Sequence, residues 1–200
     1  MKGLILAGGH GTRLRPLTFT GNKHMIPIAN KPMIFYGLEH LAKAGIKEIA
    51  VILGPIREGV RETVGDGSNI GLEITYIDQP DPKGLAHAVL VAEDFLKGGP
   101  FVMYLGDNLL KQGVRPLVNA YFNHSSDCVI CVTVVNNPEL QQRYGVVEID
   151  SEGKVSRLVE KPRQPKSNLA LAGAYLFNES IFEAVKKIKP SWRTENSISK

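Results

Sequence analysis

Short apolar runs alternate along this chain with segments whose apolar positions recur every three or four residues. The first pattern predicts buried strands and the second predicts amphipathic helices. We expect strands over residues 2–7, 47–53, 73–77, 101–105, 128–135, 144–150, 155–160 and 169–177. We expect helices over residues 31–44, 58–64, 85–96, 116–123 and 179–187.

Strands that alternate with helices predict right-handed crossovers between neighbouring parallel strands. The expected fold class is therefore α/β, with a Rossmann-like, mostly parallel sheet and helices on both faces. A turn at Ser151-Glu152-Gly153 separates two expected strands and adds an antiparallel hairpin region. Ligands of such sheets bind outside the carboxyl ends of the strands. The most polar strand exits follow Ala7 and Leu105, so we expect the site there.

Length and composition indicate an ordinary globular protein. Two hundred residues, 43% apolar and 22% charged, suffice for a single domain over residues 1–200. No apolar run approaches the roughly 20 residues that span a bilayer. The run over residues 4–7 is too short for a secretory signal, so we expect a cytoplasmic protein without a membrane partner.

The two cysteines do not indicate a metal or redox site. Cys128 and Cys131 lie in an expected buried strand, where positions three apart face opposite sides. A second pair of metal ligands is missing, and the five histidines show no metal-ligand spacing. We expect both cysteines to be structural.

Charge is concentrated at the start of the chain. The net charge is +4, but the first 38 residues alone carry +5 and contain no acid. A local cluster of this kind fits a bound polyanion better than a generally basic surface does, and we expect no nucleic-acid partner.

The loop over residues 8–14 reads G-G-H-G-T-R-L and follows the first expected strand. It is not a Walker A loop, because no Gly-Lys-Ser/Thr follows. It is not a dinucleotide fingerprint either, because Leu14 stands at the third glycine position and no acid follows about 20 residues on. Exposed amides and Arg13 favour phosphate binding. A plain tight turn remains the alternative.

Two other residues are candidates for the site, but their positions in the sequence do not decide their roles. Lys23 is either a phosphate ligand or a solvated charge. Asp107 follows an apolar strand, where a carboxylate can hold Mg²⁺ against a phosphate or cap a turn.

Six motifs in order carry a resemblance that no single one of them would. They are G-G-x-G-T-R-L, N-K-H-M-I-P-I-A-N-K-P-M-I, D-Q-P-D-P-K-G-L-A-H-A, L-G-D-N, R-Y-G-V-V-E and V-E-K-P-x-x-P-K-S-N. Together they resemble the sugar-phosphate nucleotidyltransferases, most closely the glucose-1-phosphate thymidylyltransferases, from residue 1 to about residue 192.

The resemblance implies a reaction and a set of roles. A sugar 1-phosphate oxygen attacks the α-phosphorus of dTTP or UTP and releases pyrophosphate, with glucose 1-phosphate the expected acceptor. Arg13 would stabilise the pyrophosphate, Lys23 the sugar phosphate, and Asp107 would bind the cofactor Mg²⁺. The implied nucleotide-binding residues are Leu6, Gly8, Gly9, Gly11, Thr12, Gln79 and Gly84. The implied residues for the sugar and its phosphate are Asn108, Tyr144, Gly145, Glu160 and Lys161.

Two departures from the family pattern modify this expectation. His24 stands where many relatives have Gln. After Arg193 the chain lacks the acidic segment that carries a second metal ligand in the family. We therefore expect a catalytic domain that is incomplete at its C-terminus and impaired in turnover, with a nucleotide-binding half over about 1–110 and a sugar-binding half over about 111–193.

Three alternatives are weighed against this hypothesis. The chain could bind a nucleotide or nucleotide-sugar without catalysis, or act on another sugar 1-phosphate. A dinucleotide-dependent oxidoreductase is disfavoured by Leu14 and by the missing acid. The choice between dTTP and UTP stays open, and so does assembly into a homo-oligomer.

Overall fold

The computed structural model describes residues 1–9, 11–19, 21–57, 59–81, 83–124 and 126–188, and the side chain of Arg13 is also outside the description. One large sheet has the strand order β5-β4-β1-β6-β10-β8-β9, and β7 pairs with β10. The strands of this sheet are β1 (Lys2–Ala7), β4 (Glu48–Leu53), β5 (Glu73–Asp78), β6 (Phe101–Leu105), β7 (Cys128–Val134), β8 (Gly145–Ile149), β9 (Val155–Glu160) and β10 (Leu169–Phe177). A separate ribbon consists of β2 (Pro27–Ile28) and β3 (Lys31–Pro32).

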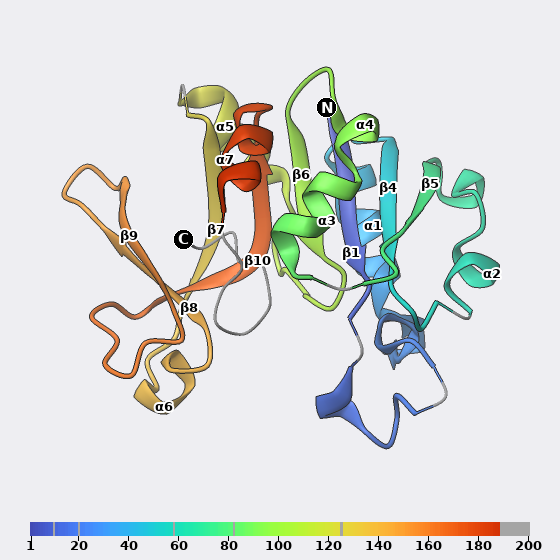
Figure 1. Ribbon diagram of the computed structural model, residues 1–200, viewed down its shortest axis with the longest axis horizontal. Helices are drawn as coiled ribbons and strands as arrows, with labels where there is room; N and C mark the ends of the chain where they lie inside the picture. Colours follow the sequence, from blue (N-terminus) through green and yellow to red (C-terminus); the bar gives the residue numbers. More distant parts are fainter. Residues whose placement is uncertain (10, 20, 58, 82, 125, 189–200) are drawn as a thin grey trace.

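The sheet combines a parallel and an antiparallel part (Figure 1). Strands β5, β4, β1 and β6 are parallel, whereas β10 joins β6 in the antiparallel direction. The first residues of β10 pair with β8 and its last residues pair with β6, with a register shift between Leu171 and Tyr175. The expected α/β fold is confirmed, and its antiparallel region extends from the predicted β8–β9 hairpin to β10 and β7.

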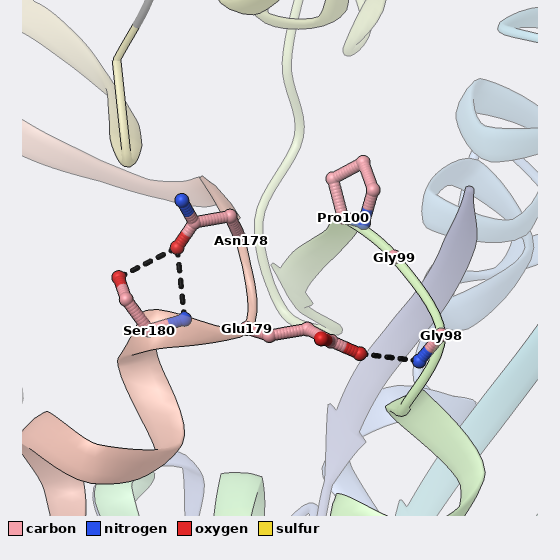
Figure 2. A pocket seen from close by; sticks show the side chains of 6 residues that line it. All are labelled: Gly98, Gly99, Pro100, Asn178, Glu179 and Ser180. Atoms are coloured by element: carbon pink, nitrogen blue, oxygen red, sulfur yellow. Dashed lines mark hydrogen bonds between the residues drawn. The ribbon is translucent and has the colours of Figure 1, made fainter.

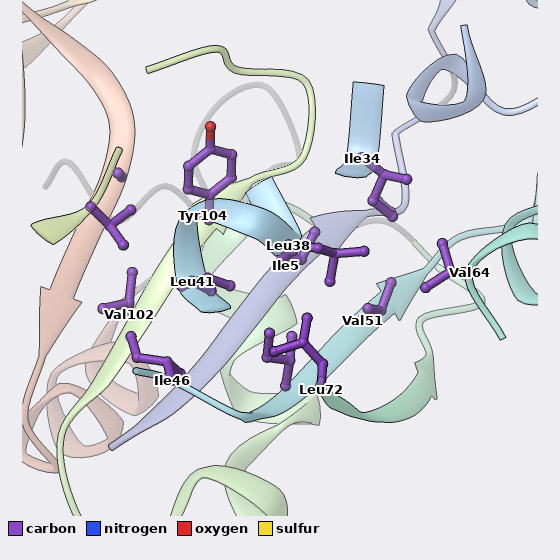
Figure 3. Close-up of a cluster of buried hydrophobic side chains, with 14 of the residues drawn as sticks. Ile5, Ile34, Leu38, Leu41, Ile46, Val51, Val64, Leu72, Val102 and Tyr104 are labelled. Atoms are coloured by element: carbon purple, nitrogen blue, oxygen red, sulfur yellow. The ribbon is translucent and has the colours of Figure 1, made fainter. Parts of the chain in front are cut away.

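Helices cover both faces of the sheet, as the sequence predicted. They are α1 (Met33–Lys43), α2 (Val60–Val64), α3 (Leu85–Val91), α4 (Glu93–Leu96), α5 (Arg115–Asn123), α6 (Pro138–Gln141) and α7 (Ser180–Lys187), with 3₁₀ turns η1 (Thr12–Leu14), η2 (Lys23–Met25) and η3 (Ser68–Ile70). One apolar cluster joins α1, α2 and α5 to Ile5 of β1, and Figure 3 shows part of it. A second joins α3, α4 and α7 to Leu4 and Leu6. Because side chains alternate along a strand, β1 is buried on both faces.

Two predicted helices have different boundaries in the structure. Helix α1 begins at Met33, because Lys31 and Pro32 pair with β2 instead. The helix expected over residues 85–96 is interrupted at Ala92, where φ is −93° and ψ is 2°. These differences do not alter where β1 and β6 end, so the expected position of the site is unchanged.

The strand that contains the cysteines is less buried than predicted. Cys128 is exposed, Cys131 is half-buried, and both are free. Strand β7 is an outer strand that pairs with β10 alone in the described part of the chain, which leaves Val134 57% exposed. None of the described helices is long and apolar enough to cross a membrane.

Candidate functional site

The carboxyl ends of β1 and β6 lie next to each other. Leu6 pairs with Leu105, and the Gly106 amide donates to the Leu6 carbonyl at 3.0 Å. From β1 the chain builds β4 and β5 on one side and then returns to place β6 on the other. Such a reversal of strand order opens a crevice in α/β sheets and is their usual ligand site. The structure therefore brings together the two strand exits that the sequence singled out.

Lys23 and Asp107 meet across this edge. The Lys23 Nζ forms an ion pair with Asp107 Oδ2, although the two residues are 84 positions apart in the chain. The two side chains are 19% and 35% exposed. A Cβ placed on Gly9 would lie 3.2 Å from the Lys23 Nζ, so the ammonium lies directly beside the glycine-rich loop.

The ion pair sets the charges of this site. Burial works to raise the pKa of the Asp107 carboxyl, but the charge and hydrogen bond of Lys23 outweigh it and hold that pKa below its usual range. Burial, and then the Lys23 charge, lower the pKa of His24 to about 4. His24 is therefore neutral at pH 7, and among the described side chains Lys23 and Asp107 carry the charges that meet at this edge.

The expected nucleotide-binding residues line the ends of β1 and β5. Leu6 is the penultimate residue of β1, and Thr18 Oγ1 donates to the Gly11 carbonyl at 2.7 Å, which closes the loop that includes Thr12. Gln79 is 4% exposed and its amide contacts the His87 ring at 2.7 Å. A Cβ on Gly8 would lie 3.5 Å from Gln79 Oε1, so these two expected residues are neighbours.

Gly84 immediately precedes α3 and therefore stands at the amino end of that helix. Its φ of 91° and ψ of −178° differ from helical values. The joint role of Gly84 and Gln79 in reading a base stays a prediction.

Several expected sugar-binding residues lie near the bend that β10 makes at its register shift between Leu171 and Tyr175 (Figure 1). Gly145 pairs with Glu160, and the Lys161 amide donates to the Tyr144 carbonyl at 2.9 Å. A Cβ on Gly145 would lie 2.8 Å from Leu171 Cδ1. Thus the four residues lie together at one end of the β8–β9 hairpin, and Gly145 places this end beside Leu171 of β10.

Asn108 reaches the same bend from the other side. Its Nδ2 lies 3.4 Å from the Ala172 carbonyl, and its own carbonyl accepts a 2.7 Å hydrogen bond from the buried Tyr104 hydroxyl. Burial raises the pKa of Tyr104 to about 12, so the hydroxyl stays a donor. Strand β10 therefore links the loop of Asp107 to the β8–β9 hairpin.

Some predicted features lie outside the described residues. These are the Arg13 side chain and residues 189–200, which include the positions where the family carries its acidic segment. Among the residues that the structure describes, no group of three or more His, Cys, Asp or Glu could hold a metal ion. The donor at the described site is the single carboxylate of Asp107, which suits Mg²⁺ because this ion often takes one or two carboxylates plus substrate phosphates.

An open surface hollow of about 510 Å³ lies at the opposite edge of the sheet (Figure 2). It is lined by Gly98, Gly99, Pro100, Asn178, Glu179 and Ser180, before β6 begins and after β10 ends. Its one charged side chain is Glu179, whose carboxylate accepts from the Gly98 amide. An acidic lining of this kind does not favour phosphate.

Asn22 is a residue of the site that the sequence prediction missed. It precedes η2 and its side chain accepts from the His24 amide, which caps the turn. Asn is a preferred capping residue. That preference could have identified the cap, but not the distant partners of its amide.

Known proteins resemble the chain along its whole length. A sequence model of the family described as Nucleotidyl transferase matches residues 2–200. A low-salt glycan biosynthesis nucleotidyltransferase of Haloferax volcanii is 48% identical, and a glucose-1-phosphate thymidylyltransferase of Streptomyces antibioticus is 50% identical. Each alignment covers 100% of this chain and 55% of the relative, so the chain spans about half the length of these curated relatives.

Solved structures share the fold. A Bacillus anthracis protein assigned as a glucose-1-phosphate thymidylyltransferase, in complex with sucrose, superimposes with a TM-score of 0.90 at 36% identity and covers 100% of this chain and 80% of its own. A UDP-glucose pyrophosphorylase complexed with UDP-glucose gives 0.86 at 28% identity, with 99% and 83% covered. The family match covers the two loops that meet at the ends of β1 and β6. The chain belongs to the nucleotidyl transferase family.

Proposed function

We propose that this chain carries the site for transferring a nucleotidyl group from dTTP or UTP to glucose 1-phosphate. One observation carries the proposal. The Lys23 ammonium, the Asp107 carboxylate and the glycine-rich loop meet at the point where the strand order reverses. Phosphoryl transfer needs positioning and charge neutralisation more than it needs a dedicated base.

The reaction forms one P–O bond and breaks another. An oxygen of the sugar 1-phosphate attacks the α-phosphorus of the triphosphate, and the bond from that phosphorus to the bridging oxygen of the β-phosphate breaks. The products are the nucleotide-sugar and pyrophosphate. Lys23 neutralises the charge that gathers on the reacting phosphates, and Arg13 is proposed to do so for the leaving pyrophosphate.

Divalent metal belongs to the proposal as well. Asp107 would hold Mg²⁺, which when bound neutralises phosphate charge. The positive charge that faces Asp107 in the structure is the Lys23 ammonium. When phosphates bind, the Lys23 ammonium gains anionic partners.

The remaining site residues are proposed to divide by substrate. Leu6, Gln79 and Gly84 would bind the base, whereas Asn108, Glu160 and Lys161 would bind the sugar phosphate. This division corresponds to a nucleotide-binding half over about 1–110 and a sugar-binding half over about 111–193. It is supported by the neighbouring positions of Gly8 and Gln79 and by the convergence of the second group on β10.

The test is pyrophosphate release with dTTP or UTP, glucose 1-phosphate and saturating Mg²⁺. We expect release that EDTA abolishes, and a loss in kcat of about 10²–10³-fold in Lys23→Ala. Asp107→Asn should weaken the apparent Mg²⁺ affinity by about 10–100-fold. Lys186→Ala is the matched control, because it removes an ion pair with Glu93 on the helices α7 and α4.

The outcomes separate the candidate functions. No release with any sugar 1-phosphate, together with stabilisation by nucleotide, would favour the non-catalytic binding protein. Release with another sugar 1-phosphate alone would redirect the substrate assignment. Equal activity in Lys23→Ala and Lys186→Ala would refute the proposed role of Lys23.

A further inference from the structure

Asn22 is buried between the end of β1, the loop after β4 and the turn that carries Lys23. Its side chain is 3% exposed. Nδ2 lies 3.0 Å from the Ala7 carbonyl and 2.6 Å from the Ile56 carbonyl, while Oδ1 lies 2.9 Å from the His24 amide and 2.6 Å from His24 Nδ1. An Asn side chain offers two donor hydrogens and two acceptor lone pairs. All four are used.

The partners fix the orientation of this amide. Carbonyl oxygens only accept, so the NH₂ group must face Ala7 and Ile56. The His24 backbone N–H only donates, so the oxygen must face the turn. It follows that His24 carries a proton on Nδ1, consistent with a neutral ring whose proton position is set by its partner.

These bonds tie the Lys23 turn to the parallel part of the sheet. Ala7 is the last residue of β1, and it pairs with Leu53, the last residue of β4. Ile56 lies in the loop that follows β4. Lys23 is adjacent to Asn22 in sequence, and its ammonium reaches Asp107 after β6, on the other side of β1. Among the described residues, the backbone hydrogen bonds within η2, such as the one from the Met25 amide to the Asn22 carbonyl at 3.0 Å, are local to the turn.

We propose that Asn22 is a positioning residue for Lys23. By holding η2 to the ends of β1 and β4, it fixes the Lys23 ammonium beside Gly9 and opposite Asp107. This inference rests on the proposed function for its catalytic consequence, but the position of Lys23 can be measured without turnover. Capping of η2 alone would give Asn22 a purely local role.

Three variants distinguish the positioning role of Asn22, through its bonds to the Ala7 and Ile56 carbonyls, from local capping of η2. Asn22→Ala removes all four bonds. Asn22→Ser keeps a hydroxyl that can cap the turn, since Ser is as good a cap as Asn, but it is too short to reach both carbonyls. Asn137→Ala is the matched control, because Asn137 caps α6 by accepting from the amides of Glu139 and Leu140.

The first measurement is the rate at which limiting acetic anhydride acetylates each lysine, followed by peptide mapping of the substrate-free protein. We expect Lys23 to react about 3–10-fold faster in Asn22→Ala and Asn22→Ser than in the wild type, because its ammonium leaves the shielded position beside Asp107. Lys97 and Lys187 should not change, and Asn137→Ala should not alter Lys23. An unchanged Lys23 rate in both Asn22 variants, or a change in Asn22→Ala alone, would overturn the proposal.

The second measurement is a double-mutant cycle on kcat/KM for pyrophosphate release. We expect Asn22→Ala to lower it by about 10–100-fold in the wild-type background and to have no further effect in Lys23→Ala, because interacting residues are not additive. An equal loss in both backgrounds would show that Asn22 acts independently of Lys23. If the wild type releases no pyrophosphate, the proposed function fails, and the acetylation rates still decide the role of Asn22. Circular dichroism establishes whether each variant is folded. If Asn22→Ala does not fold, Asn22→Ser is used in its place in both measurements.

Discussion

At the scale of single residues, the bend of β10 depends on Gly173. Its φ is +66°, and a Cβ there would lie 1.6 Å from Asn108 Nδ2. The clashing atom is the end of a side chain, so an added methyl group would displace the Asn108 amide rather than the strand. Glycine is favoured at this position for two reasons: it adopts the positive φ easily, and it leaves room for the Asn108 amide.

Gly173→Ala should therefore impair sugar binding specifically. We expect KM for glucose 1-phosphate to rise about 10-fold with KM for dTTP unchanged, measured by steady-state kinetics. The matched control is Gly71→Ala, because Gly71 has a φ of +71° and open space around it. Both variants should lose about 1–2 kcal/mol of stability from the same backbone strain. A similar rise in KM in the two variants would contradict the role of Asn108.

His24 predicts how stability depends on pH. Burial, and then the Lys23 charge, lower its pKa from 6.5 to about 4, so the unfolded chain binds this proton more readily than the folded one. The His24 contribution is complete above pH 6.5 and declines as the pH falls from 6.5 to 4. The shift corresponds to roughly 2–4 kcal/mol in the free energy of unfolding.

His24→Gln should flatten that decline. Urea denaturation at pH 7 and pH 4 measures it, and the same substitution at the exposed His124 is the control. If the wild type and His24→Gln lose equal stability between these pH values, His24 is not buried in its neutral form.

At the scale of elements, the contact of α1 with β6 favours glycine at a helix position where alanine would ordinarily be more stabilising. Gly37 lies in α1, and a Cβ there would approach the fully buried Tyr104 ring to 2.9 Å. Replacing glycine by alanine in a helix usually adds about 1 kcal/mol of stability. Overpacking a core costs about 1–3 kcal/mol. The ring is also held by its hydrogen bond to Asn108, so it cannot yield easily.

We therefore expect Gly37→Ala to lower the free energy of unfolding by about 1–2 kcal/mol in urea denaturation. In a Tyr104→Leu background, where the ring is absent, the same substitution should stabilise instead. A gain in the wild-type background would show that the core relaxes around the methyl group.

Elements also show where prediction from the sequence succeeds. The run from Leu4 to Ala7 gave β1 because its residues are apolar on both faces, and α1 followed from its periodic apolar positions. The break at Ala92 was not predicted, because its residues fit one continuous helix. Nor was the exposure of Cys128, since apolar composition alone does not show that a strand is an outer one.

At the scale of the whole molecule, the site depends on strand order. Lys23 and Asp107 belong to segments that follow β1 and β6, and only the parallel pairing of these strands brings them together. The first 38 residues carry all the net positive charge, and the fold directs part of it to this edge. We expect the bound triphosphate to interact with that charge.

Thermal unfolding tests this expectation. At about 100 times its Kd, dTTP should add about 2.7 kcal/mol and raise Tm by roughly 5–10 °C. Added salt screens the charges, and a tenfold weaker affinity would remove about 1.4 kcal/mol, or half of the shift. Thymidine, which lacks the phosphates, is the control. Equal shifts for thymidine and dTTP would show that the base, not the phosphate charge, provides the binding energy.

The sequence by itself determined the alternation of strands and helices, the concentration of positive charge and the order of the family motifs. These depend on local periodicity and on residue type, which neighbouring positions express directly. Only the tertiary structure decided that Lys23 faces Asp107, that Asn22 reaches the ends of two strands and that Gly173 lies against Asn108. Each is a contact between distant segments, because strand order and register, not local pattern, determine which loop ends become neighbours.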